Sequence, residues 1–153
     1  MARVCLDRST TRAQLEQAMA SLGWALARHL ERGAFHHGGM VWTGPADTVA
    51  TYTEYAALYA RVVELPDAYL EDLFDLLDVH ERVDLLELLG ESAADEVERM
   101  EAVLRLAALV LEDAPDHEVE DALAEALMHE SIMVRRAAFA ALDVRGWTTL
   151  EPT

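Results

Sequence analysis

The sequence predicts an all-α fold of about seven helices, packed as antiparallel hairpins in a short or irregular stack. Apolar residues recur at spacings of three and four nearly throughout the chain, which is the period of an amphipathic helix. Glycine and proline interrupt this pattern at intervals, and the connections after Pro66 are short. We therefore expect residues 1–146 to form a single helical domain, followed by a loose C-terminal tail at 147–153.

The N-terminal part predicts two helices separated by a long connection. Thr11 and Gln14 have the spacing of a capping box, and apolar residues continue the helical pattern to about residue 32. Four glycines then fall within residues 33–45, a density that no helix tolerates. A second helix is predicted from about residue 48 to Glu64.

Five further helices are predicted after Pro66, at about 68–77, 79–89, 95–112, 116–129 and 131–146. Asp78 and Glu81 have the spacing of a capping box for the second of them. Asp95, Asp116 and Ser131 lie where N-caps are expected. Each helix is short enough to pack against its neighbour as a hairpin.

Composition places the chain among globular proteins. It has 153 residues, 52% of them hydrophobic, and one cysteine, Cys5. A single cysteine allows no internal disulfide, which fits a reducing compartment. No apolar run reaches the length of about 18 residues that a membrane span needs, and the first residues lack the apolar segment of a signal peptide. We expect a cytoplasmic location.

The negative charge is concentrated in the middle of the chain. The net charge is −17, and residues 64–130 hold 22 acidic residues but only 3 arginines. Such a field repels nucleic acid and anionic membranes and attracts basic partners. We therefore expect no direct binding of nucleic acid and no membrane association.

The segment 70–92 is the main candidate binding surface, because its carboxylates are spaced at helical intervals with little basic compensation. Like charges in such a register destabilise an isolated helix, so the pattern suggests a use beyond solubility. The plainer interpretation is a solvated helix face opposite a leucine core. The candidate residues are Glu71, Asp75, Asp78, Glu81, Asp84, Glu87 and Glu91.

Aromatic residues suggest a second candidate surface. Tyr52, Tyr55 and Tyr59 would share one face of the predicted second helix, and Trp42 lies nearby on the glycine-rich connection. Tyrosine is enriched at binding hot spots, although core packing is the plainer interpretation.

No catalytic or metal-binding pattern is present. The six histidines lack the spacing of a zinc or di-iron motif, and no nucleophile elbow or phosphate loop appears. We predict no cofactor, no metal and no catalytic residue. An enzyme that uses His36 and His37 of the loop 33–45 remains an alternative hypothesis.

The segment LAEALMHESIMVRRAAFAALDVRG, residues 123–146, resembles one HEAT-like helical repeat. The similarity covers only the C-terminal helix pair, residues 116–146, and rests on Ala126, Leu127, Val134, Arg135, Ala138, Ala141 and Leu142. It implies a helical hairpin within a degenerate stack. Arg135 lies at a helix N-terminus, where the dipole disfavours a cation, so we expect it to pair with a carboxylate of the preceding helix.

Together these observations predict a non-catalytic, acidic protein-binding module that docks a basic protein surface. An inhibitor such as an immunity protein or antitoxin, covering a nuclease or another nucleic-acid-binding protein, is the most concrete version. The alternative is a structural scaffold subunit, in which helical repeats assemble into a homo-oligomer. Charge and size alone support the inhibitor version.

Overall fold

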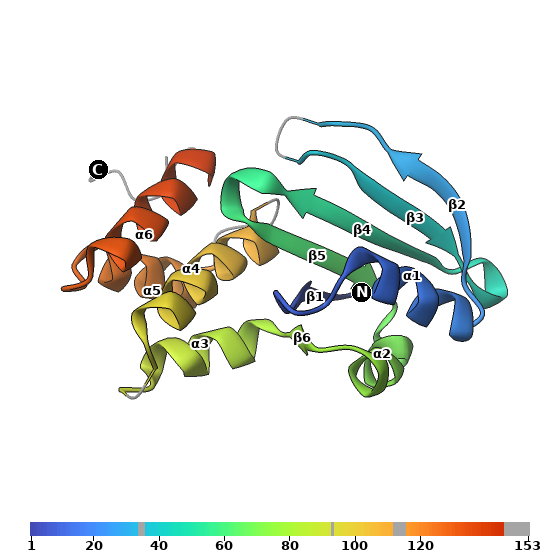
Figure 1. Cartoon of the computed structure of the whole chain (residues 1–153), viewed down its shortest axis with the longest axis horizontal. Helices are drawn as coiled ribbons and strands as arrows, with labels where there is room; N and C mark the ends of the chain where they lie inside the picture. The colour runs from blue at the N-terminus through green and yellow to red at the C-terminus, as the bar shows by residue number, and fades with distance from the viewer. Residues whose placement is uncertain (34–35, 93, 112–115, 146–153) are drawn as a thin grey trace. The chain divides into compact units, whose positions relative to one another are not determined.

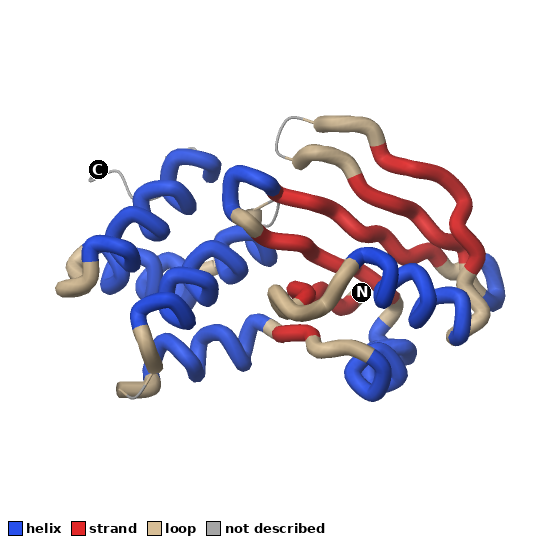
Figure 2. Tube along the Cα trace, in the orientation of Figure 1, coloured by secondary structure: helices blue, strands red, loops and turns tan. Residues whose placement is uncertain are grey.

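The fold is mixed α and β, so the prediction of an all-α protein is wrong. The computed structural model describes residues 1–33, 36–92, 94–111 and 116–145. Its main feature is a six-stranded sheet with strand order β2-β3-β4-β5-β1-β6 (Figures 1 and 2). The helical period that the sequence suggested holds mainly for the second half of the chain.

The chain divides into two compact units. The first comprises residues Met1–Tyr55 and Arg61–Glu81, and the second comprises Ala56–Ala60 and Arg82–Thr153. The prediction of one domain over residues 1–146 remains a prediction, and the predicted tail 147–153 lies outside the described residues.

The first unit contains the sheet and two α-helices. Its strands and helices are β1 (Ala2–Leu6), α1 (Arg12–Ser21), β2 (Ala25–Leu30), β3 (Gly39–Thr43), β4 (Val49–Tyr55), β5 (Ala60–Leu65), α2 (Leu70–Leu76) and β6 (Val79–His80). Short 3-10 turns lie at η1 (Pro45–Asp47) and η3 (Asp67–Tyr69). The pairs β1–β5, β1–β6, β2–β3 and β3–β4 are all antiparallel.

The helix predicted over residues 11–32 is a helix followed by a strand. The capping box is confirmed: Gln14 N donates to Thr11 Oγ1 at 3.1 Å, and Thr11 N donates to Gln14 Oε1 at 2.8 Å. The helix ends at Ser21, because Gly23 turns the chain with a φ of 86°, a value that glycine adopts without strain. Residues Ala25–Leu30 then form β2.

The helix predicted over residues 48–64 is a β-hairpin. Its two strands, β4 and β5, are joined by the short turn η2 (Ala56–Leu58). The first strand reads VATYTEY, and valine, threonine and tyrosine all favour strands. Tyr52, Tyr55 and Tyr59, at spacings of three and four, matched the period of a helix in the sequence.

One face of the sheet carries the core of the first unit. Alternate strand residues point toward this face, as period-two strands require, and α1 and α2 pack on it. The cluster includes Val4, Leu6, Leu15, Met19, Trp24, Met40, Trp42, Ala50, Tyr52, Val63, Leu65, Leu73 and Val79.

The described part of the second unit contains the short turn η2 and two helical hairpins. The first hairpin pairs α3 (Arg82–Gly90) with α4 (Glu96–Val110), and the second pairs α5 (His117–Leu127) with α6 (Ile132–Arg145). The predicted N-caps Asp95 and Asp116 are confirmed, because they accept from Glu98 N at 2.8 Å and Val119 N at 3.2 Å. Helix α4 contacts the other three helices, and its residues from Ala102 to Val110 are all buried.

The same arginine contact recurs in both hairpins. Arg99 in α4 donates from Nη1 to Leu89 O at 2.9 Å and from Nη2 to Glu91 O. Arg135 in α6 donates from Nη1 to His129 O at 2.7 Å and to Glu130 O at 3.0 Å. Each arginine thus satisfies carbonyl groups left open where the preceding helix ends. The expected carboxylate partner of Arg135 is replaced by these carbonyls.

Within the described residues, no helix combines the length and the apolar character that a membrane span requires.

Candidate functional site

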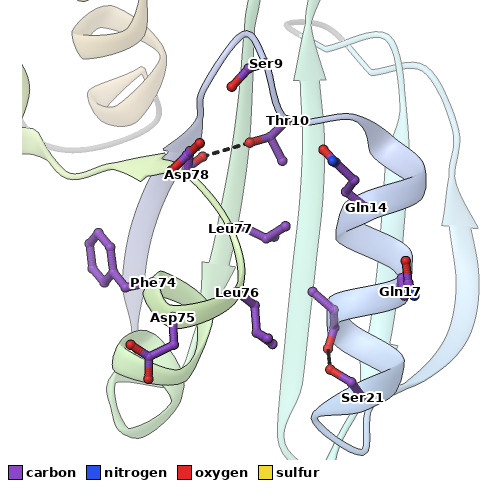
Figure 3. Close-up of a pocket in the computed structure, with 11 residues that line it drawn as sticks. Ser9, Thr10, Gln14, Gln17, Ser21, Phe74, Asp75, Leu76, Leu77 and Asp78 are labelled. Carbon is purple, nitrogen blue, oxygen red and sulfur yellow. Dashed lines mark hydrogen bonds between the residues drawn. The ribbon is translucent and has the colours of Figure 1, made fainter.

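A groove of about 730 Å³ in the first unit is the candidate functional site. One side is formed by α1, and the other by the end of α2 and the residues that follow it. Figure 3 shows Leu76 and Leu77 pointing toward α1 and Asp78 beside Thr10, whereas the side chains of Phe74 and Asp75 point away from α1. The lining residues are Ser9, Thr10, Gln14, Gln17, Ala18, Ser21, Phe74, Asp75, Leu76, Leu77 and Asp78.

Hydrogen bonds from the loop after β1 hold the upper end of the groove. The carbonyl oxygen of Asp78 accepts from Asp7 N at 3.0 Å and from Thr10 Oγ1 at 3.1 Å. Thr10 N in turn donates to Asp7 O at 3.0 Å. Because these bonds join the loop before α1 to the segment after α2, they fix the two sides of the groove to one another.

The Asp7 carboxylate is the electrostatic centre of this junction. Its Oδ2 accepts from Ser9 N at 2.9 Å and from Ser9 Oγ at 2.6 Å, and its Oδ1 lies 2.8 Å from His80 Nε2. Burial would raise the pKa of Asp7, but the hydrogen bonds from Ser9 and His80 outweigh it and lower the pKa well below its ordinary value. Asp7 is therefore ionised at neutral pH.

The groove presents amides and hydroxyls on one side. Gln14, Gln17 and Ser21 recur on α1 at spacings of three and four, which places them on one face of the helix. The amide oxygen of Gln14 is engaged in the capping box. Ser21 Oγ donates to Ala18 O at 2.7 Å. This side can exchange hydrogen bonds with the backbone or polar groups of a bound segment.

The opposite side combines apolar and acidic groups. Phe74 and Leu76 are 37% and 48% exposed, so a partner can reach them. Asp75 and Asp78 are exposed carboxylates on the same stretch of chain. A groove with this lining fits a segment that carries both a basic and an apolar side chain.

Four of the seven predicted carboxylates belong to the first unit, and the structure brings two of them to the groove. Asp75 and Asp78 line it, whereas Glu71 lies exposed one turn earlier on α2. Glu81 is half-buried and follows β6. The predicted capping box of Asp78 and Glu81 is wrong, because a strand separates these two residues.

The other three carboxylates belong to the second unit. Asp84 and Glu87 are exposed on α3, and Glu91 is exposed just after that helix ends. The helix begins at Arg82 rather than near Val79, so Glu81 directly precedes it. Asp84 and Glu87 keep the predicted spacing of three residues on α3.

The predicted aromatic surface is not one face. Trp42 and Tyr52 are 2% and 0% exposed and belong to the core. Tyr55, 5% exposed, lies three residues from Tyr52 on β4 and so points to the opposite side of the sheet. Tyr59 is 87% exposed in the turn before β5.

The connection 33–45 contains the whole of β3, so it is not one long loop. His36 and His37 lie between β2 and β3. His36 Nδ1 accepts from Gly38 N at 3.2 Å, and His37 N donates to Glu54 O at 2.8 Å. Among the described residues, no group of three or more His, Cys, Asp or Glu side chains is arranged to hold a metal ion.

Most residues of the groove were not among the predicted site residues. Gln14, Gln17 and Ser21 had a readable signal, since their spacing marks a polar helix face. Leu76 and Leu77 had none, because only the folded chain brings them opposite α1.

Comparisons of the chain with family models, with curated proteins and with solved structures give no match.

Proposed function

We propose that this protein is a non-catalytic binding protein that docks a basic protein through the groove beside α1. The observation that carries the proposal is the lining of the groove, where Asp75 and Asp78 accompany the exposed apolar side chains of Phe74 and Leu76. A basic side chain would meet the carboxylates, and an apolar neighbour would contact the leucines. The polar residues of α1 would accept or donate the remaining hydrogen bonds.

The charge of the whole chain supports this proposal. With a net charge of −17, the molecule attracts cationic proteins over a distance and speeds their encounter. Contacts in the groove would then fix the complex. In its most concrete form, the protein is a cytoplasmic inhibitor, of the immunity-protein or antitoxin kind, that covers a cationic site of a nuclease.

The C-terminal hairpins fit the role of a scaffold in this proposal. We propose that α3–α4 and α5–α6 form a short, degenerate HEAT-like stack. The repeated contact of Arg99 and Arg135 with preceding carbonyl groups supports that relationship. Arg99 and Arg135 lie four residues after Asp95 and Ser131, the residues that directly precede α4 and α6. Each arginine donates its backbone N–H to the carbonyl of that residue at 3.1 Å.

The test compares two charge reversals of equal size. The first variant is Asp75→Arg with Asp78→Arg, which changes the groove. The control is Asp72→Arg with Asp121→Arg, which changes two exposed carboxylates outside it. Each variant and the parent chain are used to capture partners from a lysate of the native host, and the captured protein is then titrated calorimetrically.

We expect the parent chain and the control variant to bind one basic partner stoichiometrically. The groove variant should not bind it. Two exposed charges in a binding groove are expected to change affinity by roughly 10- to 100-fold. Equal loss of binding in both variants would show that total charge alone attracts the partner. Undiminished binding by the groove variant would overturn the role of the groove.

A further inference from the structure

The outer face of the last helix is unusual because it carries large apolar side chains in solvent. Ile132, Arg136, Phe139 and Asp143 recur at spacings of four, three and four along α6 and share one face. Phe139 is 64% exposed and Ile132 is 51% exposed. The opposite face of the same helix is buried through Val134, Ala137, Ala138 and Ala141.

The exposed apolar side chains continue into the turn before α6. Met128, at the C-cap of α5, is 85% exposed. Single exposed apolar residues are ordinary, but several on one hairpin mark an interaction surface. The question is which partner this surface fits.

The charges on this face indicate which partner it fits. Arg136 and Asp143 are exposed and form no ion pair within the described part of the chain. Arg136 precedes Phe139 by three residues, and Asp143 follows Ala140 by three. Arg136 and Asp143 therefore lie at equal distances along the helix from the midpoint between Phe139 and Ala140. They carry opposite charges.

A second copy of α6 complements this face when it runs antiparallel. A two-fold axis between Phe139 and Ala140 sets Arg136 of each copy opposite Asp143 of the other, while Phe139 packs on Ala140. A parallel arrangement would set arginine against arginine and aspartate against aspartate, which is repulsive. A closed two-fold contact of this kind uses one patch twice.

We propose that the outer face of α6 is a homodimer interface, in which two copies pack antiparallel through Phe139 and two Arg136–Asp143 ion pairs. The small residue Ala140, half-buried at the edge of this face, leaves room for the neighbouring aromatic ring. One helix face buries less area than the roughly 1,200 Å² that stable complexes start from. The dimer is thus of the weak, concentration-dependent class.

The proposal concerns the second unit and is independent of ligand binding in the groove. The net charge of −17 repels two copies at long range, so the ionic strength of the measurement matters. At about 0.15 M salt the screening length is about 8 Å. Long-range repulsion is then reduced, and ion pairs in direct contact persist.

The test is sedimentation of the full-length chain over a wide concentration range at that ionic strength. Arg136→Asp or Asp143→Arg alone sets like charges opposite one another twice per dimer. Either is expected to raise the dissociation constant about tenfold. The double variant, R136D with D143R, keeps the net charge of the parent and restores both pairs, so its dissociation constant should return to within about threefold.

Two further variants separate the interface from general effects of charge and folding. Phe139→Ala removes the central contact and should abolish dimers, with circular dichroism confirming that the helices remain. Arg32→Asp makes the same charge change on an exposed residue of the first unit and should leave the dissociation constant unchanged. A chain that stays monomeric at millimolar concentration overturns the proposal, as does a double variant no better than the singles.

Discussion

Arg82 binds Asp116 with two parallel hydrogen bonds, Nε to Oδ2 at 2.7 Å and Nη2 to Oδ1 at 2.9 Å. The pair joins the first turn of α3 to the N-cap of α5, where Asp116 Oδ1 also accepts from Val119 N. These hydrogen bonds, which Arg82 donates and Asp116 accepts, are the main cause that lowers the pKa of Asp116 and the main cause that raises the pKa of Arg82. One carboxylate thus connects two hairpins of the second unit.

Arg82→Met is expected to lower the free energy of unfolding by about 1–2 kcal/mol, near the lower end for charged hydrogen bonds because the pair is partly solvated. Arg82→Lys should recover only part of this loss, because an ammonium cannot form the parallel pair of bonds. The control is Arg12→Ala, which removes an exposed contact to Glu16 at 3.5 Å. It should change stability by less than about 0.5 kcal/mol. Denaturant titration measures all three, and equal losses from Arg82→Met and Arg12→Ala would contradict the assignment.

The lowered pKa of Asp7 predicts that the stability of the fold decreases at acid pH. Because its pKa is lower in the folded chain than in the unfolded chain, ionised Asp7 stabilises the fold above its unfolded pKa of about 3.9. That contribution is lost progressively as the pH falls toward the folded pKa. Asp7→Asn should therefore destabilise the protein at pH 7, and the difference from the parent should shrink below about pH 4.

The cause of the shift can be separated with Ser9→Ala. This change removes the hydrogen bond from Ser9 Oγ, so the pKa of Asp7 should rise toward its ordinary value. Carboxyl chemical shifts followed by NMR measure that pKa directly. An unchanged pKa in Ser9→Ala would show that this hydroxyl has no part in the shift.

The raised pKa of Tyr52 predicts that the stability of the fold decreases at alkaline pH. Burial raises its pKa, and the hydrogen bond to Glu54 Oε1 at 2.8 Å and the charge of that carboxylate raise it further. The neutral phenol thus stabilises the fold below its unfolded pKa of about 10, and this contribution is lost as the pH rises through the folded pKa. Tyr52→Phe should cost about 1 kcal/mol at pH 7, with the difference from the parent shrinking above pH 10. Ultraviolet titration should also lose one tyrosine transition, the one shifted above the ordinary pKa of the phenol.

The parts of the fold that the sequence predicted correctly depend on local signals. Thr11, Asp95 and Asp116 each cap a helix by accepting a backbone N–H three residues later, a relationship visible in the sequence itself. The two C-terminal hairpins follow from such signals. Strand β2 was missed because Leu26 and Leu30 continue the spacing of α1 across Gly23. Gly23, with its positive φ, lies in the short turn that separates the two elements.

The candidate site was predictable only in part. Asp75 and Asp78 stood out through their charge, and they do line the groove. The other side of the groove lies more than fifty residues away in the sequence, on α1, and comes close only because both helices pack on the same sheet face. Tyr52 was misassigned to a surface because helical periodicity does not distinguish the buried face of a strand. Trp42 was placed on the glycine-rich connection, although it is a buried residue of β3.

The C-terminal arginine contacts predict an effect on the hairpins. Arg135→Ala leaves the carbonyl groups of His129 and Glu130 without their partner, so unfolding should become easier by about 1–2 kcal/mol. Arg136→Ala changes the next residue, which is exposed, and in dilute solution should alter stability by less than about 0.5 kcal/mol. Thermal unfolding of both variants at low protein concentration distinguishes a specific cap from a general loss of positive charge. Equal destabilisation would exclude the cap.

Substitution by alanine is expected to affect stability differently at two glycines, Gly39 and Gly90. A Cβ at Gly39 would lie 1.7 Å from Tyr52 O across the β3–β4 pair, so Gly39→Ala forces the two strands apart. We expect a loss of about 2–3 kcal/mol, comparable to overpacking a core. A Cβ at Gly90, at the end of α3, would meet nothing within 4 Å, so Gly90→Ala should be neutral or stabilise by up to about 1 kcal/mol through the unfolded state. Denaturant titration of the two variants tests the close approach of β3 and β4, because a tolerated alanine at position 39 is incompatible with that pairing.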